Sequence, residues 1–269
     1  MCTLLIGIDV LGPKTAVLGA NRDESPERAT AGPGVLVVSP RVVGGRDLVA
    51  GGTWLAIREG RFATALMNRR PRPDDPVDGL RSRGLLCLEA ASTARLDLPT
   101  RLDPGTGEGR PDAWDAALRR LGNGAYGRCT LVGIDPDLGS WAVQGGGGDQ
   151  PHGVPIPAGW HAITHGDLDD PVEPRTRHVL SLLEGMKPRG VDDALELFAS
   201  ILRSHGEDGS PAVCIHRDHF PTVSSTLLAL GAVDRPRYLH AEGPPCVTDY
   251  RDHSALLGAD APHTARERA

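Results

Sequence analysis

The order of the apolar segments is the sequence feature that most constrains the fold of this chain. Short apolar runs separated by turn residues come first, over residues 4–10 and 15–19 and again over 53–68, and they predict two β-hairpins. Apolar residues at helical spacing follow over 79–98 and 112–121, and they predict two helices. The first half thus consists of a block of strands followed by a block of helices.

The second half of the chain continues in blocks. We expect strands near residues 129–134, 141–144 and 160–164, helices over 175–183 and 191–203, and strands near 212–216 and 222–230. The Pro/Gly-rich residues 99–110 predict a surface loop. Because strands and helices do not alternate regularly, the pattern favours an α+β fold with largely antiparallel sheets. We expect one domain over residues 1–257 and a frayed tail at 258–269.

Composition and charge exclude several classes of function. Hydrophobic residues make up 39% and charged residues 24% of the 269 residues, which is ordinary for a globular protein with a real core. The formal net charge of −6 disfavours a nucleic-acid partner, because phosphate neutralisation needs clustered Lys and Arg. No apolar run approaches the roughly 20 residues that span a bilayer, and the start lacks the basic region of a secretory signal. We therefore expect a cytoplasmic protein without a membrane partner.

The five cysteines are widely spaced, and no two of them form a Cys-x-x-Cys pair. This spacing supports neither a disulfide framework nor a structural zinc site. Cys87, Cys129 and Cys214 lie in apolar runs, which favours inert packing. His216 and His219 raise the question of a metal, but a spacing of three at a strand end places them on opposite faces. We expect no metal and no cofactor.

Cys2 is the first candidate for chemistry. Methionine is readily removed before a small residue, and the mature chain would then begin with a residue that carries both a thiol and a free α-amine. The amine has an unperturbed pKa of about 7.7–8.0, so it can serve as a base near neutral pH. When protonated it favours the thiolate. One residue can thus supply nucleophile and base, although a cysteine at position two also occurs by chance.

The second candidate is the run Asn21-Arg22-Asp23-Glu24, directly after the second predicted strand. In the hairpin this strand lies beside the one that carries Cys2, so the polar run and the thiol come to the same end of the sheet. A charged turn is the alternative interpretation of the same four residues.

Several motifs in fixed order resemble those of the NRDE-motif family, also called the transport and Golgi organisation protein 2 family. The opening Met1-Cys2-Thr3-Leu4-Leu5 and the segment Ala20-Asn21-Arg22-Asp23-Glu24 carry the resemblance first. It continues through residues 44–48, 50–55, 65–69 and 82–84, with weaker echoes at 222–226 and 242–246. The resemblance implies an N-terminal nucleophile hydrolase with a four-layer αββα sandwich, similar to the choloylglycine hydrolase and penicillin V acylase group.

By that analogy Cys2 attacks an amide carbonyl, Asp23 holds the α-amine and Arg22 tunes the thiolate. Asn68, at the end of the second hairpin, would help to bind the oxyanion, although an Asn that merely ends a strand is an equal alternative.

Two further residues, Asn21 and Trp54, are predicted to contact the substrate. For Trp54, packing in the core is the competing interpretation.

Two departures from the family pattern point to a specialised member. Thr164-His165 stands where relatives tend to carry Ser-Asn, so an imidazole that can donate a hydrogen bond or act as an acid replaces an amide. Val223 stands where relatives often carry an arginine, so a positive charge that can bind a carboxylate is missing.

The resulting prediction is a cysteine N-terminal nucleophile enzyme, an amidohydrolase or acyltransferase, that acts on a small-molecule amide or acyl substrate. The alternatives are a non-catalytic haem-binding or trafficking protein, since eukaryotic relatives have been linked to haem handling, and a scaffold with a dead site. No haem-attachment motif is present.

Overall fold

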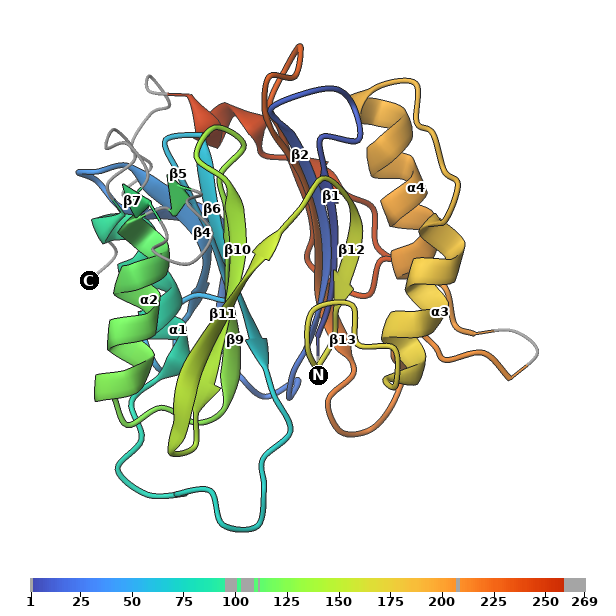
Figure 1. Cartoon of the computed structure of the whole chain (residues 1–269). Helices are drawn as coiled ribbons and strands as arrows, with labels where there is room; N and C mark the ends of the chain where they lie inside the picture. The colour runs from blue at the N-terminus through green and yellow to red at the C-terminus, as the bar shows by residue number, and fades with distance from the viewer. Residues whose placement is uncertain (1, 95–100, 103–108, 111, 207–208, 259–269) are drawn as a thin grey trace, which may run out of the picture.

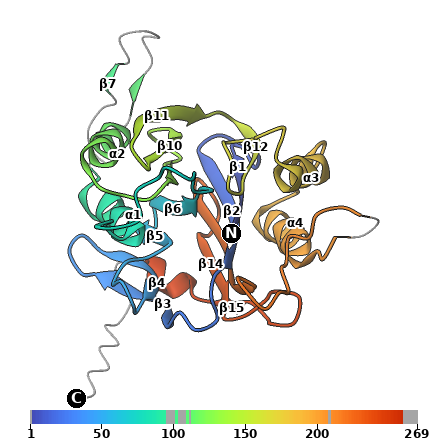
Figure 2. The same cartoon turned by 90° about the horizontal axis from the view of Figure 1, so that it is seen from below.

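Two antiparallel β-sheets lie face to face, and a pair of helices covers the outer surface of each (Figure 1). The computed structural model describes residues 2–94, 101–102, 109–110, 112–206 and 209–258. Seen from below, α1 and α2 lie on one side and α3 and α4 on the other, with both sheets between them (Figure 2). The four layers therefore run helix, sheet, sheet, helix, which is the αββα sandwich that the family resemblance implies.

The first sheet carries the N-terminal strand in its interior. Its order is β12-β1-β2-β13-β14-β15. The strands are β1 (Thr3–Ile8), β2 (Thr15–Asp23), β12 (Gly159–Ile163), β13 (Thr222–Gly231), β14 (Arg237–Ala241) and β15 (Arg251–Asp252). β2 and β13, which come from opposite ends of the sequence, thus lie side by side.

The second sheet has the order β11-β10-β9-β6-β5-β4-β3. Its strands are β3 (Thr30–Val37), β4 (Val42–Asp47), β5 (Leu55–Arg58), β6 (Phe62–Asn68), β9 (Cys129–Ile134), β10 (Ser140–Gly146) and β11 (Asp149–Ile156). A separate short ribbon joins β7 (Arg101–Leu102) to β8 (Gly109–Arg110).

Helices α1 (Arg83–Thr93) and α2 (Asp112–Asn123) pack on the second sheet, and α3 (Pro174–Leu183) and α4 (Val191–Arg203) pack on the first. A short 3₁₀ helix, η1 (Ser254–Leu257), follows β15. Within the described residues, no helix is long and apolar enough to cross a membrane.

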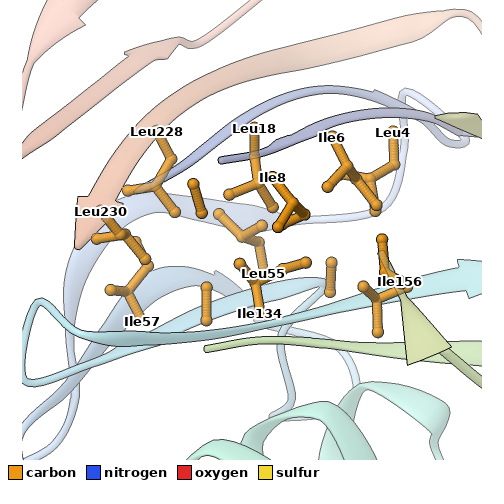
Figure 3. Close-up of a cluster of buried hydrophobic side chains, with 14 of the residues drawn as sticks. Leu4, Ile6, Ile8, Leu18, Leu55, Ile57, Ile134, Ile156, Leu228 and Leu230 are labelled. Carbon is orange, nitrogen blue, oxygen red and sulfur yellow. The ribbon is translucent and has the colours of Figure 1, made fainter. Parts of the chain in front are cut away.

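The largest apolar cluster fills the space between the two sheets (Figure 3). Successive residues of a strand face opposite sides of the sheet. In β1, Leu4, Ile6 and Ile8 therefore face this cluster, whereas Leu5 faces the core beneath α3 and α4. The same alternation turns Cys2, just before β1, toward the space between the sheets.

Most of the predicted elements are confirmed, and two predictions are wrong in detail. The first helix begins at Arg83 rather than at residue 79. Residues 212–216 form an irregular segment and no strand, although Val213, Cys214 and Ile215 are buried. Part of the predicted loop (103–108) and the predicted frayed tail (259–269) lie outside the described residues.

Candidate active site

The candidate site lies at one end of the strands of the first sheet, where β1 and β13 begin and β2 ends. Thr3 pairs with Asn21, so the register continued by one residue brings Cys2 opposite Arg22. Arg22 in turn pairs with Ser224 of β13. On the other side of β1, Leu4 pairs with Ile163, and the register continued in the same way brings His165 level with Cys2. The predicted nucleophile thus has neighbours on both sides.

Cys2 is partly buried and packs against the core between the sheets. It lines a pocket between the sheets, together with Leu4, Ala20, Asn21, Arg22, Trp54, Leu55, Ala65, Leu66, Met67, Ser224 and Thr226. Burial raises the pKa of the Cys2 thiol, and the negative charge of Asp23 raises it further. A backbone hydrogen bond from Asp23 and the positive charge of Arg22 act in the opposite direction. A thiol held in this way needs a base to become a nucleophile.

Arg22 links the two sheets at this pocket. Its side chain is 7% exposed, and its guanidinium carbon lies 4.3 Å from the ring centroid of Trp54, which belongs to the segment before β5. One guanidinium nitrogen lies 3.7 Å from a carboxylate oxygen of Glu24. The aromatic face and the carboxylate together fix a positive charge beside the thiol.

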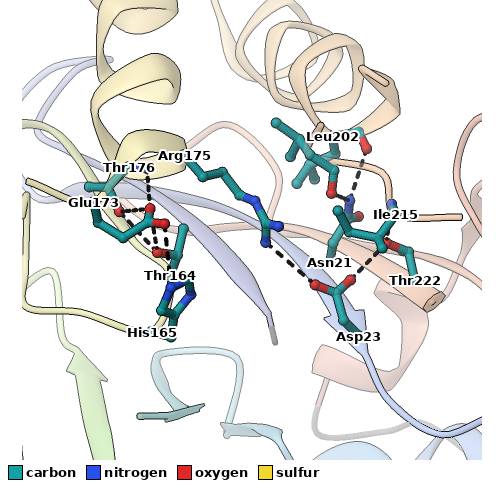
Figure 4. Close-up of polar contacts among 11 residues, drawn as sticks. Asn21, Asp23, Thr164, His165, Glu173, Arg175, Thr176, Leu202, Ile215 and Thr222 are labelled. Carbon is teal, nitrogen blue, oxygen red and sulfur yellow. Dashed lines mark hydrogen bonds and ion pairs between the residues drawn. The ribbon is translucent and has the colours of Figure 1, made fainter. Parts of the chain in front are cut away.

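The Asp23 side chain is 1% exposed, and Arg175 reaches toward it from the start of α3 (Figure 4). Its Oδ1 accepts a hydrogen bond of 2.7 Å from the Thr222 hydroxyl, and its Oδ2 lies 3.7 Å from Nη1 of Arg175. Burial raises the pKa of Asp23 to about 6, even though Thr222 and Arg175 both favour the ionised form. The carboxyl group therefore changes charge close to neutral pH.

The pairing of β13 with β2 contains a bulge that makes this contact possible. Thr222 pairs with Asp23 and Ser224 with Arg22, so Val223 is the extra residue between them. A bulge of this kind redirects the side chains on either side of it. Val223 is thus placed beside the site, at the position where the sequence departs from the family pattern.

Asn21 joins β2 to the segments behind it. Its amide nitrogen donates hydrogen bonds to the carbonyl oxygens of Leu202 (2.9 Å) and Val213 (3.1 Å). Its Oδ1 is buried and has no hydrogen-bond partner among the described residues. Asn21 lies between Ala20 and Arg22, which face the pocket, so its side chain points to the helix side of the sheet and has a structural role there.

His165 lies at the other side of Cys2, in a polar cluster at the start of α3 (Figure 4). Its Nε2 is 3.4 Å from Oε1 of Glu173, and the other oxygen of Glu173 accepts hydrogen bonds from the Thr164 hydroxyl and the Thr176 amide. Burial lowers the pKa of His165 although the charge of Glu173 opposes this. Within the described part of the chain, neither ring nitrogen has a hydrogen-bond partner.

Asn68 is half-buried at the end of β6, on the facing sheet and opposite Cys129 in the register with β9. Its neighbour Met67 lines the pocket, whereas Asn68 is outside the set of residues that line it. Its assignment to the oxyanion stays a prediction.

Sequence reasoning missed Arg175 and Glu173, and it noted Thr222 only as a weak motif. Arg175 is 7% exposed, and a buried arginine in an otherwise ordinary helix start gives no signal in the sequence. Its contact with the buried carboxylate of Asp23 becomes evident only in the three-dimensional structure.

A family model resembles the N-terminal part of this chain, and solved structures share its architecture. The family model described as Transport and Golgi organisation 2 matches residues 1–99, which confirms the resemblance over that segment. The fold is similar to a Caenorhabditis elegans N-acylethanolamine-hydrolyzing acid amidase ortholog, at 11% identity and a TM-score of 0.56, over 84% of this chain and 92% of that one. It is also similar to penicillin V acylase from Agrobacterium tumefaciens, at 13% identity and a TM-score of 0.51, over 96% and 88%. No curated protein sequence matches the chain.

Proposed function

We propose that this chain, an N-terminal nucleophile hydrolase by fold, is an enzyme that cleaves or transfers an acyl group at an amide bond through Cys2. The observation that carries the proposal is the position of the Cys2 thiol. It lies at the end of β1 in a pocket between the sheets, beside a fixed arginine and a buried carboxyl group.

The reaction starts with removal of Met1, which frees the α-amine of Cys2. The neutral amine takes the thiol proton, and the thiolate attacks the carbonyl carbon of the amide. The C–N bond of the tetrahedral intermediate then breaks, and the leaving amine takes the proton from the α-ammonium. Water attacks the resulting thioester to release the acid and the free thiol. In an acyltransferase, a second amine attacks in its place.

The neighbouring residues have distinct proposed roles. The ionised carboxylate of Asp23 holds the α-amine, and the charge of Arg22 favours the thiolate. Asn68 and the neutral imidazole of His165 are the proposed donors to the oxyanion and to the leaving group.

The walls of the pocket favour an apolar acyl group, and the space beside Cys2, about 20 Å³, has to widen to admit it. Leu4, Ala20, Ala65 and Met67 supply its apolar walls. Trp54 closes one side of the pocket.

The first test is the intact mass of the purified protein, because the mechanism requires a chain that begins at Cys2. That protein is then incubated with a panel of small N-acyl amides, and the acyl adduct and the released amine are measured. We expect an adduct on the peptide that contains Cys2, no adduct and no turnover in Cys2→Ala, and full turnover in the matched control Cys129→Ala. Turnover by Cys2→Ala equal to that of the wild type would refute the mechanism, and so would retention of Met1 in an active protein.

A further inference from the structure

Four side chains of metal-binding type converge outside the candidate active site. They are His205, Cys214, His216 and Cys246, and their ligand atoms all lie within 4.8 Å of one another. The Sγ atoms of Cys214 and Cys246 are 3.5 Å apart. Nε2 of His216 is 3.2 Å from Sγ of Cys246 and 3.7 Å from Sγ of Cys214.

These separations fit a tetrahedral zinc ion. Zn–S bonds of about 2.3 Å and Zn–N bonds of about 2.0–2.1 Å at tetrahedral angles place the ligand atoms roughly 3.3–3.8 Å apart. The three measured separations lie within or close to this range. His205 is the fourth member of the set, with a ring nitrogen within 4.8 Å of the other three ligand atoms.

The four residues come from three segments that have no regular secondary structure. His205 follows the end of α4, Cys214 and His216 lie in the irregular segment before β13, and Cys246 lies in the loop after β14. This arrangement explains why the spacing in the sequence gave no sign of a site.

We propose that these residues form a closed, structural Cys2His2 site for Zn²⁺. Two thiolates and two neutral imidazoles are the ligand set that tetrahedral zinc prefers. The thiolates also neutralise the charge of the ion, which suits a cluster in which Cys214 is buried and Cys246 is half-buried.

The ion would also hold the segment that supports the candidate active site. The carbonyl oxygen of Val213 accepts a hydrogen bond from Asn21, and the amide of Ile215 donates one to the hydroxyl of Thr222. That hydroxyl donates to Asp23. A zinc ion bound to Cys214 and His216 therefore holds Val213 and Ile215 in place. Through Thr222 it positions Asp23, without contacting Asp23 itself.

The test is a metal count on untagged full-length protein that has been purified with zinc and then passed over a desalting column. We expect one zinc per chain in the wild type and in two controls, His219→Ala and Cys2→Ala. His219 is the histidine nearest to His216 in the sequence but lies outside the cluster, and Cys2→Ala separates this site from the proposed function. We expect no retained zinc in Cys246→Ser and His216→Ala, with far-UV circular dichroism used to confirm that each variant is folded.

Cobalt provides a second readout, the visible spectrum of the bound ion itself. Co²⁺ added to the metal-free wild type should give the intense visible bands of a tetrahedral ion and a thiolate charge-transfer band, and Cys246→Ser should lose the latter in large part. A wild type that retains no zinc and gives no such spectrum would overturn the proposal. A Cys214–Cys246 disulfide in protein purified under reducing conditions, found by peptide mass spectrometry, would overturn it as well.

Discussion

Arg22 is the side chain whose charge favours the Cys2 thiolate. Its guanidinium is held against Trp54, and its positive charge lowers the pKa of a thiol that burial raises. We expect Arg22→Met to raise the pKa of Cys2 further, because the thiolate loses a stabilising charge. The rate of alkylation of Cys2 by iodoacetamide, followed by peptide mass spectrometry, should then rise at higher pH than in the wild type. Arg22→Lys keeps a charge there and should give an intermediate profile, and identical profiles in all three proteins would contradict the assignment.

Asp23 makes a prediction about stability and pH. Burial raises its pKa to about 6 in the folded protein, whereas an unfolded aspartate has a pKa of about 3.9. The folded state therefore binds the proton more tightly, and the free energy of unfolding should fall by up to about 3 kcal/mol as the pH rises from about 4 to about 6. Above this window the contribution is constant.

Asp23→Asn removes this contribution, so the difference in unfolding free energy between variant and wild type isolates it. Urea denaturation at several pH values should show the variant gaining relative to the wild type between about pH 4 and pH 6, and no further change above. In Thr222→Val the carboxylate loses a hydrogen bond that favours its ionised form, so the upper end of the window should move to higher pH while the lower end stays at the unfolded pKa of about 3.9. A difference that is independent of pH would show that Asp23 titrates normally.

At the scale of single residues, the sequence predicted that Cys2 and Asp23 lie close together, but it did not predict the residues that pack behind them. Cys2 and Asp23 could be predicted because short motifs contain them and because a hairpin brings the ends of their two strands together. Arg175 and Thr222 were not, since their contacts with Asp23 join segments that are far apart in the sequence.

Two of the glycine-containing motifs meet in the structure at the start of α1. The amide of Thr53 donates to the carbonyl oxygen of Gly84 at 3.1 Å, and a Cβ added at Gly52 would overlap the backbone of Gly84 and Leu85. This close approach of two backbones explains why glycine occupies both positions, and it sets where the segment that carries Trp54 lies.

We therefore expect Gly52→Ala to lower the free energy of unfolding by about 1–3 kcal/mol, the usual cost of overpacking where backbone has to move. Gly34→Ala is the matched control, because a Cβ there meets no atom within 4 Å, and its effect should stay within about 0.5 kcal/mol. Urea denaturation followed by circular dichroism measures both. Equal stabilities of the two variants would mean that the backbones do not approach so closely.

At the scale of elements, two of the strands that sequence reasoning missed, β3 and β11, have a weak apolar pattern. β3 and β11 expose much of their length, and β11 contains two prolines and a glycine. The reverse error occurred at residues 212–216, where an apolar run predicted a strand. These side chains are buried because the segment packs behind β2, with its backbone bonded to Ser204, Asn21 and Thr222 rather than to a strand.

The whole molecule depends on the apolar layer that both sheets share. The block order of strands and helices predicted the α+β class, but the pairing of two sheets came from the family resemblance. Local patterns do not specify which strands become neighbours, as the adjacency of β2 and β13 across about two hundred residues illustrates.

Because the layer between the sheets receives side chains from both, the two sheets should unfold together as one domain. Ile134 of β9 is fully buried there, and Ile134→Ala should lower the free energy of unfolding by about 2–5 kcal/mol. Hydrogen exchange in increasing urea, read by mass spectrometry on peptides from β1 and β2 and from β9 and β10, should show the same lowered midpoint in both sheets. Val38→Ala, at a side chain that is 63% exposed, should leave both midpoints unchanged.

If the peptides of β9 and β10 lost protection at a lower urea concentration than those of β1 and β2, the sheets would be separate cooperative units and the single-domain prediction would be wrong.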